Sequence, residues 1–416
     1  MGSTSREIHR VVVTGLGAVT PIGNTTAEYW EGLRTGRNGI GRVTQFDPTE
    51  LIVQIAGEVK GWDPDVYLER KVARRTGRFA QFAHAAGVQA LTDAGLEITD
   101  ENRDDIGVVM ATSGDTFNMG PEWEVFLERG SRAVDPFIIT RMGQHMGSAR
   151  LGRQLGVRGP NTTINTACAS GTDALGHALN LIRLGHARAL LAGGAEAMVT
   201  PLALSSMGRM GALSKNNDDP THASRPFDAN RDGFILGEGA GVLMLESEES
   251  ALARGARIYC ELAGVGWSFD ATDDTAPDPQ GQSMAMLRAM KDAGVGVSEV
   301  DYINAHGTST QYNDRTETQA IKLAFGEAAK RVRISSTKSM TGHLAAGAGG
   351  IEAVASVLAL HHRTIPPTIN YEVPDPECDL DVTPNTAQAA EIDVVLSNSF
   401  GLGGQNASAI FRRYQP

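Results

Sequence analysis

The stretch that decides the fold of this chain reads Asn165-Thr166-Ala167-Cys168-Ala169-Ser170-Gly171-Thr172. The β-branched run Thr162-Thr163-Ile164 precedes it and predicts a short buried strand. Residues 172–184 follow with apolar side chains at helical spacing, so Cys168 is expected on a strand-to-helix turn. The helix dipole stabilises a thiolate there, and a free backbone N–H binds an oxyanion. An isolated cysteine is more often a small buried apolar residue; this setting instead predicts a nucleophile that titrates below a free thiol.

Two histidine motifs stand far along the chain from this cysteine. One reads Asn304-Ala305-His306-Gly307-Thr308-Ser309-Thr310, and the other reads Lys338-Ser339-Met340-Thr341-Gly342-His343. Each follows a short apolar strand pattern and precedes a helix-like stretch. Taken singly, each histidine is more simply a loop or helix-cap residue. Together with the cysteine turn, the motifs predict an active site built from one cysteine and two histidines.

Strand-like and helix-like patterns alternate along the whole chain. Apolar strand patterns recur at residues 10–15, 106–111, 189–194 and 241–245. Such strands with intervening helices indicate sheets covered on both faces, which is typical of the α/β class. No linker rich in proline or serine divides the chain, and the best candidate boundary lies at residues 248–258. We therefore expect two intimately packed halves, residues 1–254 and 255–416.

Composition argues against several classes of function. The chain has 416 residues, 48 glycines and a formal net charge of −12. That charge opposes non-specific binding to nucleic acid or to an anionic membrane, and no apolar run is long enough to span a bilayer. The three cysteines are widely spaced and give neither a disulfide framework nor a metal knuckle. We expect a soluble protein of the reducing cytoplasm, without a nucleic-acid or membrane partner.

The three motifs closely resemble the active site of the β-ketoacyl-acyl-carrier-protein synthases, the elongating condensing enzymes of the synthase II type. The resemblance extends over essentially the whole chain, including residues 228–241 and the closing run Asn398-Ser399-Phe400-Gly401-Leu402-Gly403-Gly404-Gln405-Asn406. It implies the thiolase fold, in which two similar α/β halves stack as alternating helix and sheet layers, normally in a homodimer. It also implies an acyltransferase that condenses an acyl-enzyme with malonyl-acyl-carrier protein, with loss of CO₂, to give 3-oxoacyl-carrier protein.

Roles for the site residues follow from the same resemblance. Cys168 corresponds to the nucleophile that accepts the acyl chain, and His306 and His343 correspond to the pair that promotes decarboxylation. The backbone N–H groups of Cys168 and Phe400 correspond to the oxyanion hole beside the glycine-rich closing loop. Two donors aimed at the enolate oxygen stabilise a charge that exists only transiently, which explains the need for two histidines.

Further polar residues surround these groups in the family. Lys338 and Glu352 correspond to a buried ion pair, and pairing is what makes burial of a lysine tolerable. Supporting carboxylates are expected at Asp314 and Glu317. No organic cofactor or redox metal is expected, because the thioester supplies the activation. Some relatives cradle a monovalent cation near the positions that correspond to Asn304, Glu352, Ser397 and Asn398.

The acidic carrier protein needs a local basic patch on this acidic chain. Residues 70–78 hold five cations, and helical spacing would place Lys71, Arg74, Arg75 and Arg78 on one face. Most such charge runs are simply solvated helix faces, but this one coincides with the carrier-docking helix of the family. Lys71, Arg74, Arg75 and Arg132 are therefore the predicted carrier-binding residues.

Departures from the synthase II pattern leave the acyl chain and the pathway open. Residues 112–118 replace a mostly Gly/Ile segment that lines the acyl tunnel of synthase II, and they place Asp115 there. Leu402 and Gln405 replace an aromatic residue and a smaller polar one near the gate. The alternatives are fatty-acid elongation and a specialised dissociated polyketide or polyene ketosynthase. A heterodimer with a chain-length subunit is the alternative to the homodimer.

Three other members of the superfamily fit less well. A degradative thiolase pairs its nucleophile with a second cysteine near the C-terminus, and the loop Gly403-Gly404-Gln405 has none. An initiating synthase would carry Asn in place of His343. A non-catalytic chain-length subunit would lack the nucleophile, and Cys168 argues directly against it.

Overall fold

The structure is a computed structural model that describes residues 8–416. The strands of the first half are β1 (Val11–Val19), β2 (Ile40–Arg42), β3 (Ile55–Gly57), β4 (Ile106–Ala111), β5 (Asn161–Ile164), β6 (Ala189–Ala197) and β7 (Glu238–Ser247). Its helices are α1 (Thr26–Thr35), α2 (Arg70–Ala73), α3 (Arg78–Ala94), α4 (Gly120–Arg129), α5 (Ile138–Met142), α6 (Met146–Leu155), α7 (Ser170–Arg183), α8 (Pro201–Met210) and α9 (Glu248–Ala253).

The second half begins with β8. Its strands are β8 (Cys260–Phe269), β9 (Tyr302–Asn304), β10 (Arg333–Ser335), β11 (Thr364–Ile365), β12 (Gln388–Ala389), β13 (Val394–Phe400) and β14 (Gln405–Arg412). Its helices are α10 (Pro279–Ala293), α11 (Gln311–Phe325), α12 (Lys338–Thr341) and α13 (Ala348–His362).

Both halves repeat one topology. The strand order is β5-β4-β6-β7-β1 in the first half and β10-β9-β13-β14-β8 in the second. Each unit joins three parallel strands to two antiparallel ones in the same sequence of pairings. The first strands of the two units, β1 and β8, pair only at Val12–Glu261 and Val13–Cys260. The predicted pair of similar α/β halves is confirmed; the boundary between residues 254 and 255, which falls between α9 and β8, stays a prediction.

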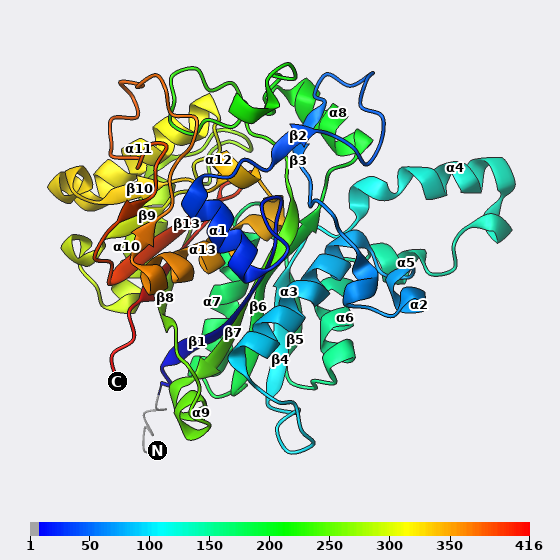
Figure 1. The fold of residues 1–416 in the computed structure, drawn as a ribbon, viewed down its shortest axis with the longest axis horizontal. Coiled ribbons are helices and arrows are strands. Elements are labelled where there is room, and N and C mark those ends of the chain that lie inside the picture. The colour runs from blue at the N-terminus through cyan, green and yellow to red at the C-terminus, as the bar shows by residue number, and fades with distance from the viewer. Residues whose placement is uncertain (1–7) are drawn as a thin grey trace.

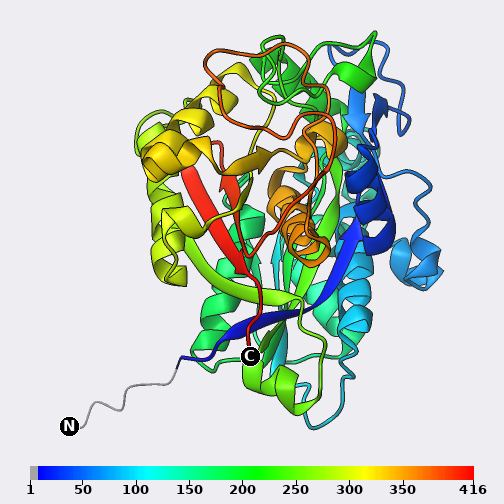
Figure 2. The same ribbon diagram turned by 60° about the vertical axis from the view of Figure 1, so that its left-hand side comes forward.

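Helices and sheets alternate in layers (Figures 1 and 2). Helices α7 and α13 each contact strands of both halves and so form the central layer. Helices α3 and α6 cover the outer face of the first unit, and α10 with α11 covers the outer face of the second. Carboxyl ends of parallel strands meet at one edge of a sheet, which is where ligands bind in such folds. The central layer therefore brings strand ends from both halves toward one site.

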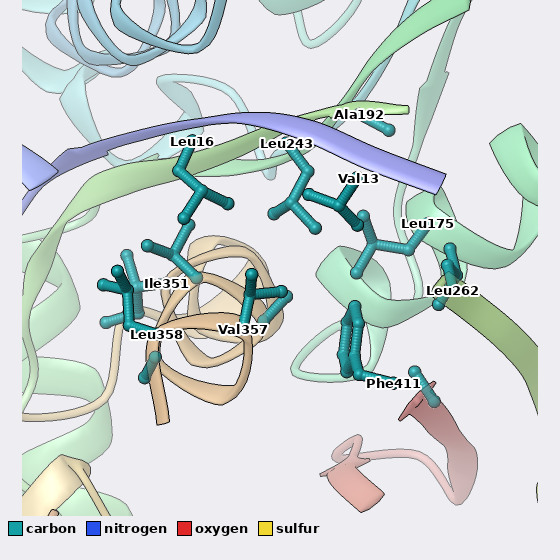
Figure 3. Close-up of a cluster of buried hydrophobic side chains, with 14 of the residues drawn as sticks. Val13, Leu16, Leu175, Ala192, Leu243, Leu262, Ile351, Val357, Leu358 and Phe411 are labelled. Carbon is teal, nitrogen blue, oxygen red and sulfur yellow. The ribbon is translucent and has the colours of Figure 1, made fainter. Parts of the chain in front are cut away.

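The central layer is also the main hydrophobic core. Leu16 and Leu243 from the first half point toward Ile351 and Val357 of α13, with Phe411 of the second half beside them (Figure 3). Burying each such side chain contributes about 1.5–3 kcal/mol. The helix lies close to the strands because glycines face each other: a Cβ on Gly241 would lie 2.3 Å from the backbone of residue 350. The halves therefore form one body and not loosely linked domains.

Candidate active site

The turn that carries Cys168 connects β5 to α7. Ala167 has φ +51°, in the left-handed region that side chains rarely adopt, and Cys168 follows it two residues before the helix. The Ser170 hydroxyl holds the turn, because it donates to the Ala167 carbonyl over 2.5 Å and accepts from the Thr166 N–H over 2.7 Å. This backbone costs about 1–2 kcal/mol, and it confirms the strand-to-helix turn expected from the sequence.

The predicted acidity of Cys168 is wrong. Burial of the sulfur raises the pKa of the Cys168 thiol above its ordinary value, although the backbone N–H of Leu402 and the Lys338 ammonium favour the thiolate. The residue as a whole is only half-buried, yet its sulfur lies against protein on the side of the histidines. The helix start was visible in the sequence, whereas desolvation by distant segments was not.

His306 lies two residues beyond the end of β9 and is 2% exposed. The Glu317 carboxylate accepts hydrogen bonds from the backbone N–H groups of His306 (2.9 Å) and Gly307 (2.7 Å) and from the Asn398 side chain (3.1 Å). Burial raises the pKa of Glu317 to about 7. Asp314 fixes the next turn, where it accepts from the Ser309 N–H. Both carboxylates therefore support the histidine loop, as the resemblance implied.

His343 lies on the turn after α12 and is 3% exposed. Its backbone N–H donates to the Ile235 carbonyl over 2.7 Å, and its ring meets the edge of Phe234 at 5.4 Å between centroids. Gly342 before it has φ +71°, so the turn favours glycine there.

Three side chains from the two halves converge at one point. The sulfur of Cys168 and one ring nitrogen each of His306 and His343 all lie within 4.8 Å of one another. The imidazole rings stand edge to face, 5.3 Å apart and inclined by 86°. Phe400, 5% exposed, places its ring 5.7 Å from that of His306. The structure therefore brings together the cysteine and both histidines that sequence motifs singled out.

A buried ion pair stands behind the histidines. Lys338 (1% exposed) pairs with Glu352 (0% exposed), and the Lys338 Nζ also lies 3.4 Å from Nδ1 of His306. Desolvation, followed by the nearby Lys338 charge, lowers the pKa of both His306 and His343 well below the ordinary value. Both imidazoles are therefore neutral at physiological pH. A neutral imidazole offers one N–H and one lone pair.

The predicted cation cradle holds buried oxygens without partners. Within residues 8–416, the Asn304 side chain, the Ser397 hydroxyl and one Glu352 oxygen accept no hydrogen bond. Asn304 and Ser397 are directly paired in neighbouring strands β9 and β13. The Asn398 side chain is already satisfied by Glu317 and Ser408. Oxygens of this kind suit a hard cation, so three of the four predicted residues fit such an ion.

The basic segment of residues 70–78 does not form the single helical face that the sequence predicted. Helix α2 ends at Ala73, and Gly77, with an extended backbone at ψ 149°, separates it from α3. Arg78 starts α3 and forms a two-pronged ion pair with the buried Glu238, at 2.6 and 2.9 Å. The prediction that Arg78 shares one helical face with the other cations is therefore wrong, because Arg78 pairs with Glu238, 160 residues away in the chain.

The remaining cations of the predicted patch are exposed. Lys71, Arg74, Arg75 and Arg132 all face solvent in the described chain. The guanidinium of Arg75 stacks over the ring of Phe137 at 4.1 Å, which joins the α2 segment to the segment that carries Arg132.

Asp115 is buried, with 8% exposure. Its backbone N–H donates to the Met142 carbonyl over 3.1 Å, and its carboxylate accepts from the Asn118 side chain over 2.8 Å. Burial raises its pKa. Burial of this carboxylate beside an acyl chain would be costly.

Sequence reasoning missed a second carboxylate clamp, at the closing loop. The Asp270 N–H donates to the Gly404 carbonyl over 2.9 Å, and its carboxylate accepts from Asn406 over 2.6 Å. The Gly403 N–H donates to the Asp274 carbonyl over 2.9 Å. The acidic segment after β8 gave no signal in the sequence, since it meets the closing loop only through the pairing of β8 with β14. Leu402, 54% exposed, and Gln405 sit on this same clamped loop.

Known families match this chain over both halves. Residues 9–251 match the β-ketoacyl synthase N-terminal domain, and residues 259–372 match the β-ketoacyl synthase C-terminal domain. The chain belongs to the β-ketoacyl synthase family and is an acyltransferase of that family. It is 51% identical to a 3-oxoacyl-(acyl-carrier-protein) synthase 2 of Synechocystis sp., over 98% of this chain and 99% of the relative. A synthase of the same name from Staphylococcus aureus is 45% identical over 98% and 99%.

Solved structures place the fold in the thiolase-like class. The ishigamide ketosynthase/chain length factor superposes with a TM-score of 0.92 at 39% identity and covers 98% of this chain and 100% of its own. The complex AntDE:AntF, a type II polyketide acyl-carrier protein with its ketosynthase, gives 0.90 at 35% identity and the same coverage. A β-ketoacyl synthase from Burkholderia phymatum gives 0.91 at 36% identity, again covering 98% and 100%.

Proposed function

We propose that this protein elongates an acyl chain by decarboxylative Claisen condensation with malonyl-acyl-carrier protein. The observation that carries the proposal is the convergence of Cys168, His306 and His343 within 4.8 Å, with both imidazoles neutral. The names of relatives, 3-oxoacyl-(acyl-carrier-protein) synthase 2, support the same reaction.

Acyl loading is the first half-reaction. The Cys168 sulfur attacks the carbonyl carbon of an acyl-carrier thioester, the C–S bond to the carrier breaks, and the carrier thiol leaves with a proton in place of the one that Cys168 gives up. Among residues 8–416, the Cys168 N–H donates to no backbone carbonyl, so it is the proposed first donor to the tetrahedral oxyanion. The proposed second donor is the Phe400 N–H.

Carbon–carbon bond formation is the second half-reaction. Malonyl-carrier protein loses CO₂, and the electron pair of the broken C–C bond moves onto the thioester oxygen as an enolate. Nζ of Lys338 lies 3.4 Å from Nδ1 of His306. Because an ammonium group only donates, Nδ1 would accept, and the ring proton would lie on Nε2, where it is available to that oxygen. His343 supplies the second donor. The enolate carbon then attacks acyl-Cys168, the C–S bond breaks, and 3-oxoacyl-carrier protein leaves.

The polar layer beneath these groups holds the donors in place. Glu317 and Asp314 fix the His306 loop, and Glu352 neutralises Lys338. We include a monovalent cation held by Asn304, Ser397 and Glu352 in the proposal, since its positive charge would satisfy their buried oxygens. No organic cofactor takes part in the proposed reaction, because the thioester supplies the activation.

The partner of the reaction is an acyl carrier protein. Lys71, Arg74, Arg75 and Arg132 are the proposed docking residues, since they are exposed and joined by the Arg75–Phe137 contact. The AntDE:AntF structure records a carrier protein bound to a similar ketosynthase, which supports this part of the proposal.

We further propose a homodimer. Strand β5 is the edge of the sheet and is followed directly by the Cys168 turn. Helix α4 extends away from the body (Figure 1) and exposes Trp123 (61%) and Leu127 (65%). An unpaired edge and exposed apolar side chains both favour burial against another chain. A heterodimer is the second candidate, favoured by the likeness to a ketosynthase/chain length factor.

Pathway and location complete the proposal. Fatty-acid elongation is our first choice, and a specialised polyketide or polyene pathway is the second, favoured by the ishigamide and AntDE likenesses. Within residues 8–416 no helix is long and apolar enough to cross a membrane; a cytoplasmic location stays a prediction. Intact-protein mass after incubation with acyl-carrier proteins of varied chain length distinguishes the pathways by showing which acyl groups load.

The variant Cys168→Gln tests the mechanism. A glutamine side chain accepts no acyl group, so condensation must stop, while its carbonyl can occupy the oxyanion hole as the acyl thioester would. We expect the variant to release CO₂ from malonyl-carrier protein and to leave acetyl-carrier protein. A folded variant that binds malonyl-carrier protein and releases no CO₂ would contradict the division of labour between thiol and histidines.

A further inference from the structure

The catalytic side chains have the composition of a zinc site. Cysteine sulfur and histidine nitrogen are preferred ligands of Zn²⁺, and three such ligands with an open fourth position are typical of catalytic zinc. Among residues 8–416, Cys168, His306 and His343 are the only group of three or more potential ligands that converge closely. Their ligand atoms lie within 4.8 Å of one another, about 1 Å more than the separation of two ligands of one tetrahedral zinc. The proposed condensation needs all three groups free of metal.

We propose that Lys338 keeps this cluster free of metal by fixing the tautomer of His306. Nζ of Lys338 lies 3.4 Å from Nδ1 of His306. A lysine ammonium only donates, so Nδ1 accepts and the ring proton lies on Nε2. A metal ion needs a lone pair on the nitrogen that it binds. At Nδ1 it would have to displace Lys338, and at Nε2 it meets the ring proton.

Metal binding through Nε2 would require two proton movements. Cys168 would release its thiol proton to solvent, and the His306 ring proton would move from Nε2 to Nδ1. The new N–H would then point at the Lys338 ammonium, donor against donor. Lys338 cannot turn away to water, because it is 1% exposed and paired with the fully buried Glu352.

The surroundings of His306 also lack what a metal site provides. A metal-binding histidine almost always donates its second ring N–H to a carboxylate, carbonyl or water, which fixes its tautomer and raises its basicity. Here the Lys338 ammonium stands at Nδ1 of His306 instead. This neighbour of the His306 ring therefore opposes a metal ion at the cluster.

This inference goes beyond the proposed condensation, although the two share one proton. The N–H on Nε2 that excludes a metal is the same donor that the enolate oxygen requires. Lys338 thus acts as a positioning residue with two consequences, and a metal-binding measurement separates them because it involves no acyl substrate. A failure of the condensation proposal would leave that measurement unchanged.

The experiment uses the full-length protein with Co²⁺ as the probe, since a cobalt–thiolate bond has a charge-transfer absorption band. Lys338→Met removes the donor and keeps the length of the side chain. The double variant Lys338→Met/Glu352→Gln removes both charges, so it leaves no unpaired buried ion. The matched control Lys338→Met/Cys168→Ala lacks the thiolate. Zn²⁺ affinity follows from competition with Co²⁺, and circular dichroism checks that each variant is folded.

We expect the two donor-free variants to bind one Co²⁺ per chain with a thiolate band and about 10–100-fold more tightly than the wild type, the range by which residues around metal ligands change affinity. The control should lose the band. At a Zn²⁺ concentration between the two dissociation constants, Cys168 should be protected from alkylation in the donor-free variants and not in the wild type. Equal affinity in wild type and variants, or folded variants without the band, would overturn the proposal. Nitrogen-15 NMR of wild-type His306 decides the tautomer independently: a proton on Nδ1 would also overturn it.

Discussion

The two halves share a topology, yet equivalent strands lead to different functional side chains: a thiol in the first half, and an ammonium and an imidazole in the second. Strand β5 of the first half leads to Cys168, while its counterpart β10 in the second half leads to Lys338 and His343. The β5 end is partly exposed and the β10 end is buried. A thiol must be reached by a substrate carried on another protein, whereas hydrogen-bond donors for an enolate are strongest where water is excluded. In the proposed mechanism, one architecture thus supplies both an accessible nucleophile and hydrogen-bond donors that are shielded from water.

The loops after β4 and β9, the next pair of equivalent strands, share a support and differ in the side chain that they carry. The loop after β4 is held by Glu196, which accepts from the Ser113 N–H over 3.1 Å, and the loop after β9 is held by Glu317. Burial raises the pKa of both Glu196 and Glu317 to about 7. Each half therefore clamps the same loop with a buried carboxylate, but only the second half mounts a histidine on it. Both halves thus share the buried carboxylate, and they differ in the proposed catalytic histidine that only the second half carries on this loop.

The largest expected effect comes from breaking the buried pair of the second half. Glu352→Ala leaves the Lys338 charge buried without a partner, which should lower the free energy of unfolding by about 3–5 kcal/mol. The matched control is Glu31→Ala, which breaks the exposed Arg34–Glu31 pair of the first half and should change it by no more than about 1 kcal/mol. Urea denaturation measures both. Equal losses would mean that burial does not distinguish the two pairs.

Removing a donor should separate the chemistry of the halves. His306→Ala and His343→Ala should each slow CO₂ release by about 10²–10³-fold, because one preorganised donor to the developing oxyanion is lost. Acyl transfer to Cys168 should persist, since it depends on the turn of the first half. Single-turnover loading and CO₂ release, measured separately, check the split. His177→Ala, an exposed change on α7, is the control, and a histidine variant that condenses at the parental rate would remove that histidine from the mechanism.

Exposure, and not acidity, should make the Cys168 thiol the reactive one. Burial raises the pKa of Cys168, of Cys260 and, to about 12, of Cys378, but only Cys168 is partly exposed. Iodoacetamide should therefore label Cys168 at least about tenfold faster than the others, with a rate that climbs about tenfold per pH unit up to its raised pKa. Peptide mapping across pH tests this. If the alkylation rate no longer rises with pH at neutral pH, Cys168 is already a thiolate there, and the low pKa predicted from the helix start would be correct.

The sequence predicted the site better than its electrostatics. Motifs that follow strands placed Cys168, His306 and His343 at strand ends, and strand ends converge in this fold. The pKa of Cys168 and the partner of Arg78 were not predictable, because each depends on segments far away in the chain. The Asp270 clamp was missed because its partner Gly404 joins it only through the pairing of β8 with β14.

The smallest expected effect concerns docking, and it compares the outer surfaces of the halves. Lys71→Glu with Arg74→Glu should raise KM for carrier-bound substrate roughly 2- to 30-fold, since each exposed ion pair contributes about 0.2–1 kcal/mol. The control variant, Lys291→Glu with Lys330→Glu, changes two exposed cations of the second half. Each substitution changes the net charge by −2, so both double variants shift it from −12 to −16. Because net charge is matched, a rise in KM for the first pair alone assigns docking to the α2 segment, and that rise should shrink with added salt. A small thioester without the carrier should react equally well in both variants. If both pairs raise KM alike, the carrier senses only the overall charge of the protein, and the basic segment after residue 70 is an ordinary solvated surface.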